Sequence, residues 1–282
     1  MKEAIETIDF HGLEALRLTA PSGASAIVSL YGAQVLSWTT PDKRERLFLS
    51  DAAVFDMQTA IRGGMPISFP QFSGLGDLPK HGFLRKHLWT VTERNHRDGY
   101  VMVSLACRDD DATRRIWPHS FSAELSVALE AARLDVELSV ENIGDGPFAF
   151  TAALHTYLQV DEVENAVLEG LYGFQYRDAL DGDKIKKDSG PTLHVSGPID
   201  RVYHDANRSL LLRDGQHSLG IQNEGFPDTV IWNPWEALCA ELPDMPKLGF
   251  RHMLCVEAAA AQRPVSVQPG ETWWGRQTLV AL

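Results

Sequence analysis

A glutamate in an apolar segment near the C-terminus has a side chain suited to proton transfer. In the segment "FRHMLCVEAA", strand alternation places Glu257 on the same face as Met253 and Cys255. Apolar neighbours raise the pKa of a carboxyl group towards the range that is useful for a general acid or base. An edge-strand or exposed position would explain this glutamate equally well, and the sequence alone leaves both interpretations open.

A histidine in a second segment offers the complementary group. The segment "TAALHTYLQV" alternates, which places His155 on one face with Thr151, Tyr157 and Gln159 and puts two leucines on the other face. A carboxylate and a histidine are the usual pair for acid/base catalysis. The alternative is that His155 is a hydrogen-bonded side chain on a solvated face.

Two further segments carry cationic and histidine side chains. In "LPKHGFLR", His81 and Arg85 follow Pro79 in an expected loop, where they are either simply exposed or part of a site. In "AIRGGMPISFPQF", Arg62 can present the planar donors of its guanidinium group to a ligand. The alternative for Arg62 is an ion pair with a local carboxylate such as Asp56.

The residues that follow Arg62 predict an unusual backbone. Pro66 and Pro70 lack the N–H that a central strand needs, so the segment is expected at a sheet edge or across a cleft. Gly63 and Gly64 are expected to let the backbone approach a ligand closely.

Composition and charge limit the classes of function. The chain has 282 residues, 44% of them hydrophobic, and a net charge of −12. An acidic surface argues against nucleic acid or an anionic membrane as a partner. The three cysteines form no C-x-x-C pair, the N-terminus lacks an apolar signal-like run, and no apolar run reaches the ~18 residues of a membrane span. We therefore expect a cytoplasmic protein.

The dominant hydrophobic period is two, which predicts an all-β protein. The segments "FSAELSVALE" and "RLDVELSVEN" alternate strictly and are joined by a short link, so an antiparallel hairpin is expected. Short helices are expected only near "DAAVFDM" and "NPWEAL". Without a repeat or a linker-like change in composition, one sandwich domain over residues 1–282 is the simplest prediction.

The usual nucleotide, zinc-protease and serine-hydrolase motifs do not occur in the chain. It contains no G-x-x-x-x-G-K-[ST], G-x-G-x-x-G, H-E-x-x-H or G-x-S-x-G sequence. The ten histidines are scattered, so we predict no metal site.

Taken in order, several segments resemble the hexose-6-phosphate mutarotase branch of the aldose 1-epimerase superfamily. These segments are "IRGGMPISFPQF", "LPKHGFLR", "LHTYL", "IDRVYHD", "VIWNPW" and "CVEAAA". The resemblance runs from about Tyr31 to the C-terminus and implies a galactose-mutarotase-like β-supersandwich with an open cleft. It also implies a sugar phosphate as the small-molecule partner, bound without cofactor or metal. The matching positions are two arginines, Arg62 and Arg85, two histidines, His81 and His155, the glutamate Glu257 and the sugar-binding aspartate Asp200.

The resemblance also implies a role for each of these side chains in exchanging the anomers of an aldose. Glu257 would take the proton from the C1 hydroxyl and His155 would protonate O5, with the roles reversed on ring closure. His81 would polarise the sugar near the reacting centre, and Asp200 would accept a hydrogen bond from a ring hydroxyl. Further substrate-binding candidates are Trp232, which could stack on the sugar or simply lie in the core, Gln71, in the segment "SFPQF", and Lys80, beside His81.

Two other classes of function remain open. A sugar-phosphate sensor without catalysis would be favoured only if Glu257 or His155 were missing, and a sugar lyase or ketose isomerase could use the same acid and base. For the assembly we expect a monomer or a weak homo-oligomer.

Overall fold

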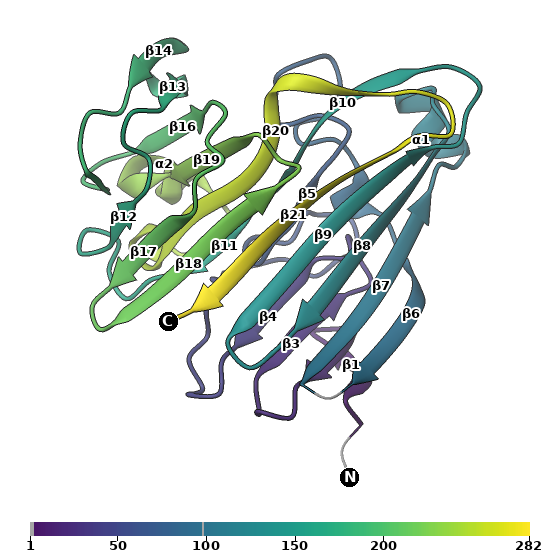
Figure 1. The fold of residues 1–282 in the computed structure, drawn as a ribbon, viewed down its shortest axis with the longest axis horizontal. Coiled ribbons are helices and arrows are strands. Elements are labelled where there is room, and N and C mark those ends of the chain that lie inside the picture. Colours follow the sequence, from purple (N-terminus) through teal and green to yellow (C-terminus); the bar gives the residue numbers. More distant parts are fainter. Residues whose placement is uncertain (1–2, 98) are drawn as a thin grey trace.

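Strands dominate the computed structural model, which describes residues 3–97 and 99–282 (Figure 1). These residues form three sheets, and the pairs between their strands are antiparallel, as the all-β prediction requires. We call them the N-terminal, inner and outer sheets. The N-terminal sheet has the order β1 (Ile5–Phe10), β2 (Leu13–Thr19), β3 (Ser25–Ser29) and β4 (Val35–Thr39).

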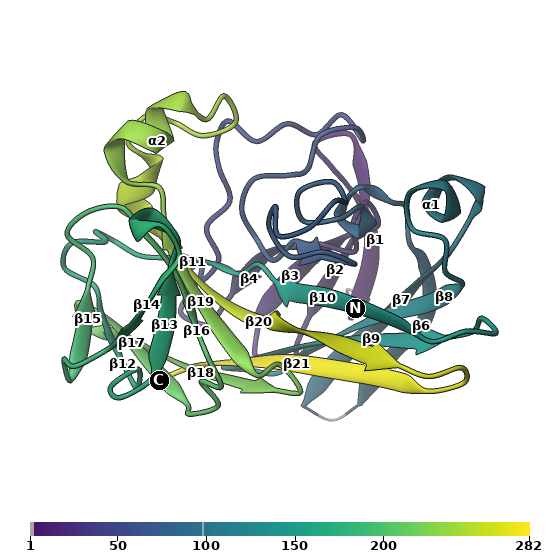
Figure 2. The same cartoon turned by 90° about the horizontal axis from the view of Figure 1, so that it is seen from above.

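The inner and outer sheets pack face to face as a sandwich (Figure 2). The inner sheet has the order β14 (Lys184–Lys187), β13 (Gln175–Asp178), β16 (Ile199–Tyr203), β19 (Asp228–Asn233), β20 (Met253–Val267), β10 (Phe148–Leu154) and β5 (Ile67–Ser68), with β11 (Tyr157–Gln159) also paired to β20. The outer sheet has the order β15 (Thr192–His194), β12 (Val167–Glu169), β17 (Leu210–Asp214), β18 (His217–Glu224), β21 (Thr272–Ala281), β9 (Arg133–Asn142), β8 (Phe121–Leu129), β7 (Tyr100–Arg108) and β6 (Thr90–Arg97).

The predicted hairpin is confirmed as β8 and β9 of the outer sheet. The two strands pair in one unbroken register, and their apolar residues are buried in the main hydrophobic core. Leu125 lies opposite Leu138, and both are fully buried. Burial of one such side chain contributes roughly 1.5–3 kcal/mol, so the strict alternation of this hairpin drives the sandwich to form.

Helices are short and few in the described part of the chain. They are α1 (Asp111–Ile116), α2 (Trp235–Glu241), η1 (Leu84–Lys86), η2 (Ala179–Asp181) and η3 (Gly249–His252). The helix predicted near "NPWEAL" is confirmed as α2, whereas the segment "DAAVFDM" forms turns and bends instead. The unpredicted α1 is capped by Asp110, whose carboxylate accepts hydrogen bonds from two backbone N–H groups of the first turn. No described helix is long and apolar enough to cross a membrane.

The segment after Arg62 lies at an edge, as its prolines predict. Strand β5 is the last strand of the inner sheet, beside β10. Gly63 and Gly64 have positive φ angles of 110° and 61°, and a Cβ atom on them would lie 2.4 Å from the Phe48 oxygen and 2.2 Å from the Val35 oxygen. The expectation that they approach a ligand is therefore wrong, because they approach neighbouring backbone.

Candidate active site

The histidine of the acid/base pair lies where one strand ends and another begins. β10 ends at Leu154 and β11 begins at Tyr157, so the strand predicted through "TAALHTYLQV" is interrupted at His155. The backbone N–H groups of His155 and Tyr157 donate to the oxygens of Pro66 and Gly64, each over 2.9 Å. The edge segment therefore fixes this corner, and His155 is buried instead of lying on a solvated face.

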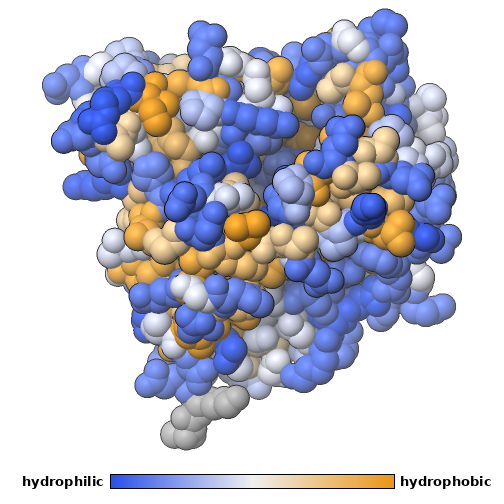
Figure 3. All heavy atoms as spheres, turned by 180° about the vertical axis from the view of Figure 1, so that it is seen from behind, coloured by the Kyte–Doolittle hydropathy of each residue, from blue (hydrophilic) through white to orange (hydrophobic). Residues whose placement is uncertain are grey.

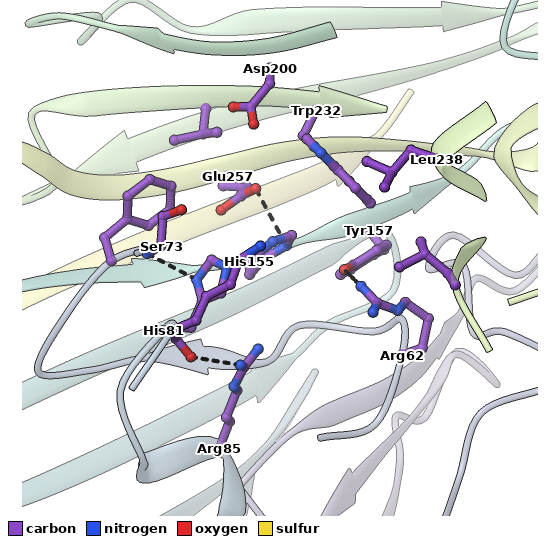
Figure 4. A pocket seen from close by; sticks show the side chains of 14 residues that line it. Arg62, Ser73, His81, Arg85, His155, Tyr157, Asp200, Trp232, Leu238 and Glu257 are labelled. Carbon is purple, nitrogen blue, oxygen red and sulfur yellow. Dashed lines mark hydrogen bonds and ion pairs between the residues drawn. The ribbon is translucent and has the colours of Figure 1, made fainter. Parts of the chain in front are cut away.

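Glu257 meets this histidine from the middle of β20. Its carboxyl group is buried, which decides between the two interpretations that the sequence left open, and Oε1 lies 3.3 Å from Nδ1 of His155 (Figure 4). Oε2 is buried and has no hydrogen-bond partner among the described residues. That oxygen is therefore a free acceptor within the site.

Burial pushes the two groups towards their uncharged forms. The pKa of Glu257 is raised well above its ordinary value by burial and by the charge of Asp200. The pKa of His155 is lowered well below its ordinary value, mainly by burial and then by His81. The uncharged pair has one carboxyl proton to donate, on Glu257, and one unprotonated ring nitrogen to accept a proton, on His155. These are the groups that acid/base catalysis requires.

His81 contributes a fixed hydrogen-bond donor. The backbone N–H of Ser73 donates to its Nδ1 over 3.3 Å, and Oγ of Ser68 lies 2.8 Å from the same nitrogen. Because Nδ1 accepts, the neutral ring carries its proton on Nε2. Burial, with Arg85 nearby, lowers the pKa of His81 to about 3, so the ring is neutral and buried, which excludes the solvent-exposed alternative.

Arg62 is held by a distant carboxylate. Its Nε lies 3.2 Å from Oδ2 of Asp244, and its Nη1 donates to the Tyr157 hydroxyl oxygen over 3.0 Å. The expected local partner, Asp56, instead accepts hydrogen bonds from the backbone of its own turn. Because a guanidinium group only donates, the Tyr157 oxygen accepts here and its O–H proton is available to a ligand.

Arg85 keeps more of its donors free. It lies in η1, and its Nη2 donates to the Lys80 carbonyl oxygen over 2.8 Å (Figure 4). Its Nε is buried and lacks a partner in the described part of the chain. A partly buried guanidinium group with unused donors is suited to an anion. Lys80 is exposed at the rim of the same cavity.

The opposite wall carries Asp200 and Trp232, which are neighbours across β16 and β19. Burial raises the pKa of Asp200. The ring of Trp232 lies 6.1 Å from those of His155 and Tyr157.

Together these side chains surround a cavity of about 250 Å³. Figure 3 shows a hollow in the face of the molecule seen from behind. The cavity brings together eight of the nine candidate residues named from the sequence, Lys80 included, and Phe72, Ser73, Tyr157, Val230, Leu238 and Leu242 complete its lining.

The remaining predicted residue, Gln71, does not line this cavity. Its amide is used by its own loop, donating to the carbonyl oxygens of Ser73 and Leu78 and accepting from the Leu78 N–H. We therefore assign Gln71 to the support of the loop that holds His81.

The sequence interpretation missed Tyr157 and the α2 segment, which supplies Leu238 and Leu242. Alternation places Tyr157 on the face of His155, which was a usable signal. Asp244 lies 182 residues from Arg62, and no local pattern indicates their contact.

An acid/base pair in a cavity of a β-sandwich agrees with what the comparisons show. The family model described as Aldose 1-epimerase matches residues 14–279. The chain is 35% identical to a Cenchrus ciliaris protein named "Putative glucose-6-phosphate 1-epimerase", over 96% of this chain and 85% of that protein. A Salmonella typhimurium protein of the same name is 31% identical, over 85% of this chain and 81% of that protein. The chain therefore belongs to the aldose 1-epimerase family, and it is an isomerase.

Solved structures show the same fold. The crystal structure titled "putative mutarotase (YeaD)" from Salmonella typhimurium superposes with a TM-score of 0.92 and 28% identity, covering 100% of this chain and 94% of that chain. A galactose mutarotase-like protein from Clostridium acetobutylicum superposes with a TM-score of 0.78 at 16% identity, covering 99% and 98% of the two chains. The expected galactose-mutarotase-like fold is thus confirmed.

Proposed function

We propose that this protein interconverts the α and β anomers of a hexose 6-phosphate, with glucose 6-phosphate as the expected substrate. The observation that carries the proposal is the buried contact between His155 and Glu257 in a cavity that also holds two arginines. The two relatives named "Putative glucose-6-phosphate 1-epimerase" support the choice of substrate.

Ring opening requires one proton to leave the C1 hydroxyl and one to reach O5. Transfer of a proton from Glu257 to His155 across their 3.3 Å contact gives a carboxylate and an imidazolium. The carboxylate takes the C1 hydroxyl proton while the imidazolium protonates O5, so the C1–O5 bond breaks and C1 becomes a carbonyl. The step returns the pair to its uncharged form, which burial favours.

Ring closure reverses these transfers after the aldehyde has rotated about the C1–C2 bond. O5 then attacks the other face of the carbonyl carbon. His155 accepts the O5 proton and Glu257 returns a proton to the C1 oxygen, so no atom or charge is gained over the cycle. Acid/base catalysis by such a group contributes about 10²- to 10⁴-fold in rate.

The remaining polar side chains are assigned to substrate binding. Arg85 and Arg62 bind the phosphate, because a chain of net charge −12 repels a dianion at long range and needs close, directional donors. Asp200 accepts a hydrogen bond from a ring hydroxyl, and His81 donates from Nε2 near the reacting centre. The Trp232 face offers an apolar surface for the sugar ring.

Tyr157 joins this set because its O–H proton is available to the phosphate or to O6. Burial raises the pKa of its hydroxyl, so the group stays protonated as a donor. We leave Lys80, at the rim, as a further candidate for the phosphate.

The test is polarimetry, or exchange measured by NMR, with the pure α-anomers of glucose, glucose 6-phosphate and galactose 6-phosphate. We expect the largest acceleration with glucose 6-phosphate. Acceleration of none of the three would remove the proposal, and binding of the sugar phosphate without acceleration would favour the sensor. Because the reaction requires only proton transfer, we also expect the rate to survive exhaustive chelation, and a loss that a divalent ion restores would contradict this mechanism.

A further inference from the structure

A thiol lies against the acid/base pair and has no part in the proposed reaction. Cys255 and Glu257 are two residues apart in β20, so alternation places both side chains on the face that meets His155. The Cys255 sulfur lies 3.8 Å from His155 Nδ1, the nitrogen that lies 3.3 Å from Glu257 Oε1. Ligand-capable atoms of all three residues lie within 4.8 Å of one another.

Two of these separations, 3.3 Å and 3.8 Å, are close to those of atoms bound to one tetrahedral ion, and the third is at most 4.8 Å. Zinc binds nitrogen and oxygen at about 2.0–2.2 Å and sulfur at about 2.3 Å, so two such ligands lie roughly 3.3–3.7 Å apart. Small side-chain rotations would therefore bring the three atoms around one ion. The partnerless Oε2 of Glu257 gives the carboxylate a second oxygen with which to bind.

An ion can reach two of the three side chains directly from the cavity, whereas Cys255 lies buried behind them. His155 and Glu257 both line the cavity, so an ion that enters it meets their ligand atoms first. Arg62, Arg85 and Lys80 oppose its entry by their charge, while Asp200, on β16 of the same sheet, favours it.

We propose that His155, Cys255 and Glu257 form a binding site for a thiophilic divalent cation of the zinc class. Thiolate, imidazole and carboxylate are the donors that zinc prefers. A bound ion would occupy the acid and the base together and would inhibit the enzyme. The inhibition rests on the proposed function, whereas the binding of the ion does not.

The binding test uses Co²⁺ as a spectroscopic probe of the intact protein. A thiolate bound to Co²⁺ gives a charge-transfer absorption in the near ultraviolet. This absorption reports metal binding and does not depend on enzyme activity. We expect this band in the wild type, and we expect Cys255→Ser and Cys255→Ala to weaken Co²⁺ binding by at least about 10-fold and to abolish the band. The matched controls, Cys107→Ser and Cys239→Ser, remove the two other buried thiols and should retain it.

Zinc inhibition is measured in parallel, each variant against its own metal-free rate. Inhibition by Zn²⁺ that a chelator reverses, and that Cys255→Ser weakens at least about 10-fold, would support the proposal. A wild type without the cobalt band, or a band that survives in both Cys255 variants, would overturn it. If the wild type shows the cobalt band but does not accelerate anomer exchange, the cation site stands and the proposed function is wrong.

Discussion

The β8 and β9 hairpin and the β10 and β20 pair are both buried antiparallel strands, yet they differ in regularity. β8 and β9 keep one register over nine residue pairs, with buried side chains alternating with more exposed ones. The pairing of β10 with β20 shifts between Phe150 and Ala152, and β20 begins with nine consecutive buried residues. One face of β20 is covered by the outer sheet, and the other face carries Glu257 at the cavity of the candidate site.

The proposed acid and base lie at the irregular pair, because Glu257 is in β20 and His155 directly follows β10. Alternation is strict where one face of a strand meets water, and it disappears where both faces are covered. In such a strand any polar side chain becomes a buried polar group, as Glu257 does. A buried polar atom without a partner costs about 1–3 kcal/mol, which the regular packing elsewhere must offset.

The largest effect should follow from removing the ionisable carboxyl group of Glu257. Glu257→Gln keeps the size of the side chain and removes the base, so we expect anomer exchange to fall at least about 100-fold while sugar phosphate binding survives. His155→Asn should behave similarly, because both groups act in the same step. Polarimetry measures the rate of anomer exchange, and equilibrium binding measures the affinity for the sugar phosphate. Glu124→Gln, on the exposed face of β8, is the matched control.

The same variant should not lower stability at neutral pH. The pKa of Glu257 in the folded protein is raised above its ordinary 4.5, so its contribution is lost as pH rises through the folded value. The glutamine side chain of the variant cannot ionise and escapes that loss. Retained activity in Glu257→Gln would reassign the base, and a large fall in Tm at neutral pH would assign the rate loss to unfolding.

The regular pair was the easier one to predict from the sequence. Strict alternation gave the hairpin and the all-β class, and alternation among Met253, Cys255 and Glu257 indicated a buried carboxylate. The interruption at His155 depends on hydrogen bonds to the edge segment, and the contact of Arg62 with Asp244 joins distant parts of the chain. Local periodicity carries no information on such contacts. Only the structure shows which residues of the site contact one another.

The second-largest effect concerns phosphate binding and distinguishes the roles of the two arginines that line the cavity beside the irregular pair. A charge-assisted hydrogen bond contributes about 1.5–3 kcal/mol, so Arg85→Ala should lower kcat/KM for glucose 6-phosphate roughly 10- to 150-fold. Free glucose lacks the anion and should lose much less. Arg62→Ala should be less selective, because Arg62 also holds Asp244 and Tyr157.

Steady-state kinetics with both sugars measures this difference. Arg114→Ala, which removes an ion-paired arginine from α1, is the control and should change neither sugar. Equal losses on both sugars for Arg85→Ala would place that arginine on the ring hydroxyls or in the scaffold. A wild type that prefers free glucose would remove the phosphate assignment altogether.

A substitution in the core of the regular hairpin should lower the stability of the protein and leave its activity nearly unchanged. Leu138→Ala removes a fully buried side chain opposite Leu125 and should lower the free energy of unfolding by about 2–5 kcal/mol. Below the unfolding transition, kcat/KM per folded molecule should change less than about twofold, because the site is not touched. Urea denaturation and kinetics on the same samples test this, and a rate loss as large as that of Glu257→Gln would show that the two regions are coupled.

The smallest expected effect is a shift in pH dependence caused by a neighbouring charge. The site is active while the pair of His155 and Glu257 holds one proton, so kcat/KM should fall at low pH, when a second proton binds, and at high pH, when the last proton leaves. Burial lowers the pKa of His155 and raises that of Glu257, which widens the active range. The negative charge of Asp200 contributes to the raised pKa of Glu257. Asp200→Asn removes that charge, so the pKa of Glu257 falls and the alkaline limb of the profile should move to lower pH, whatever the variant loses in sugar binding. An alkaline limb that stays in place or moves to higher pH would show that Glu257 does not set it.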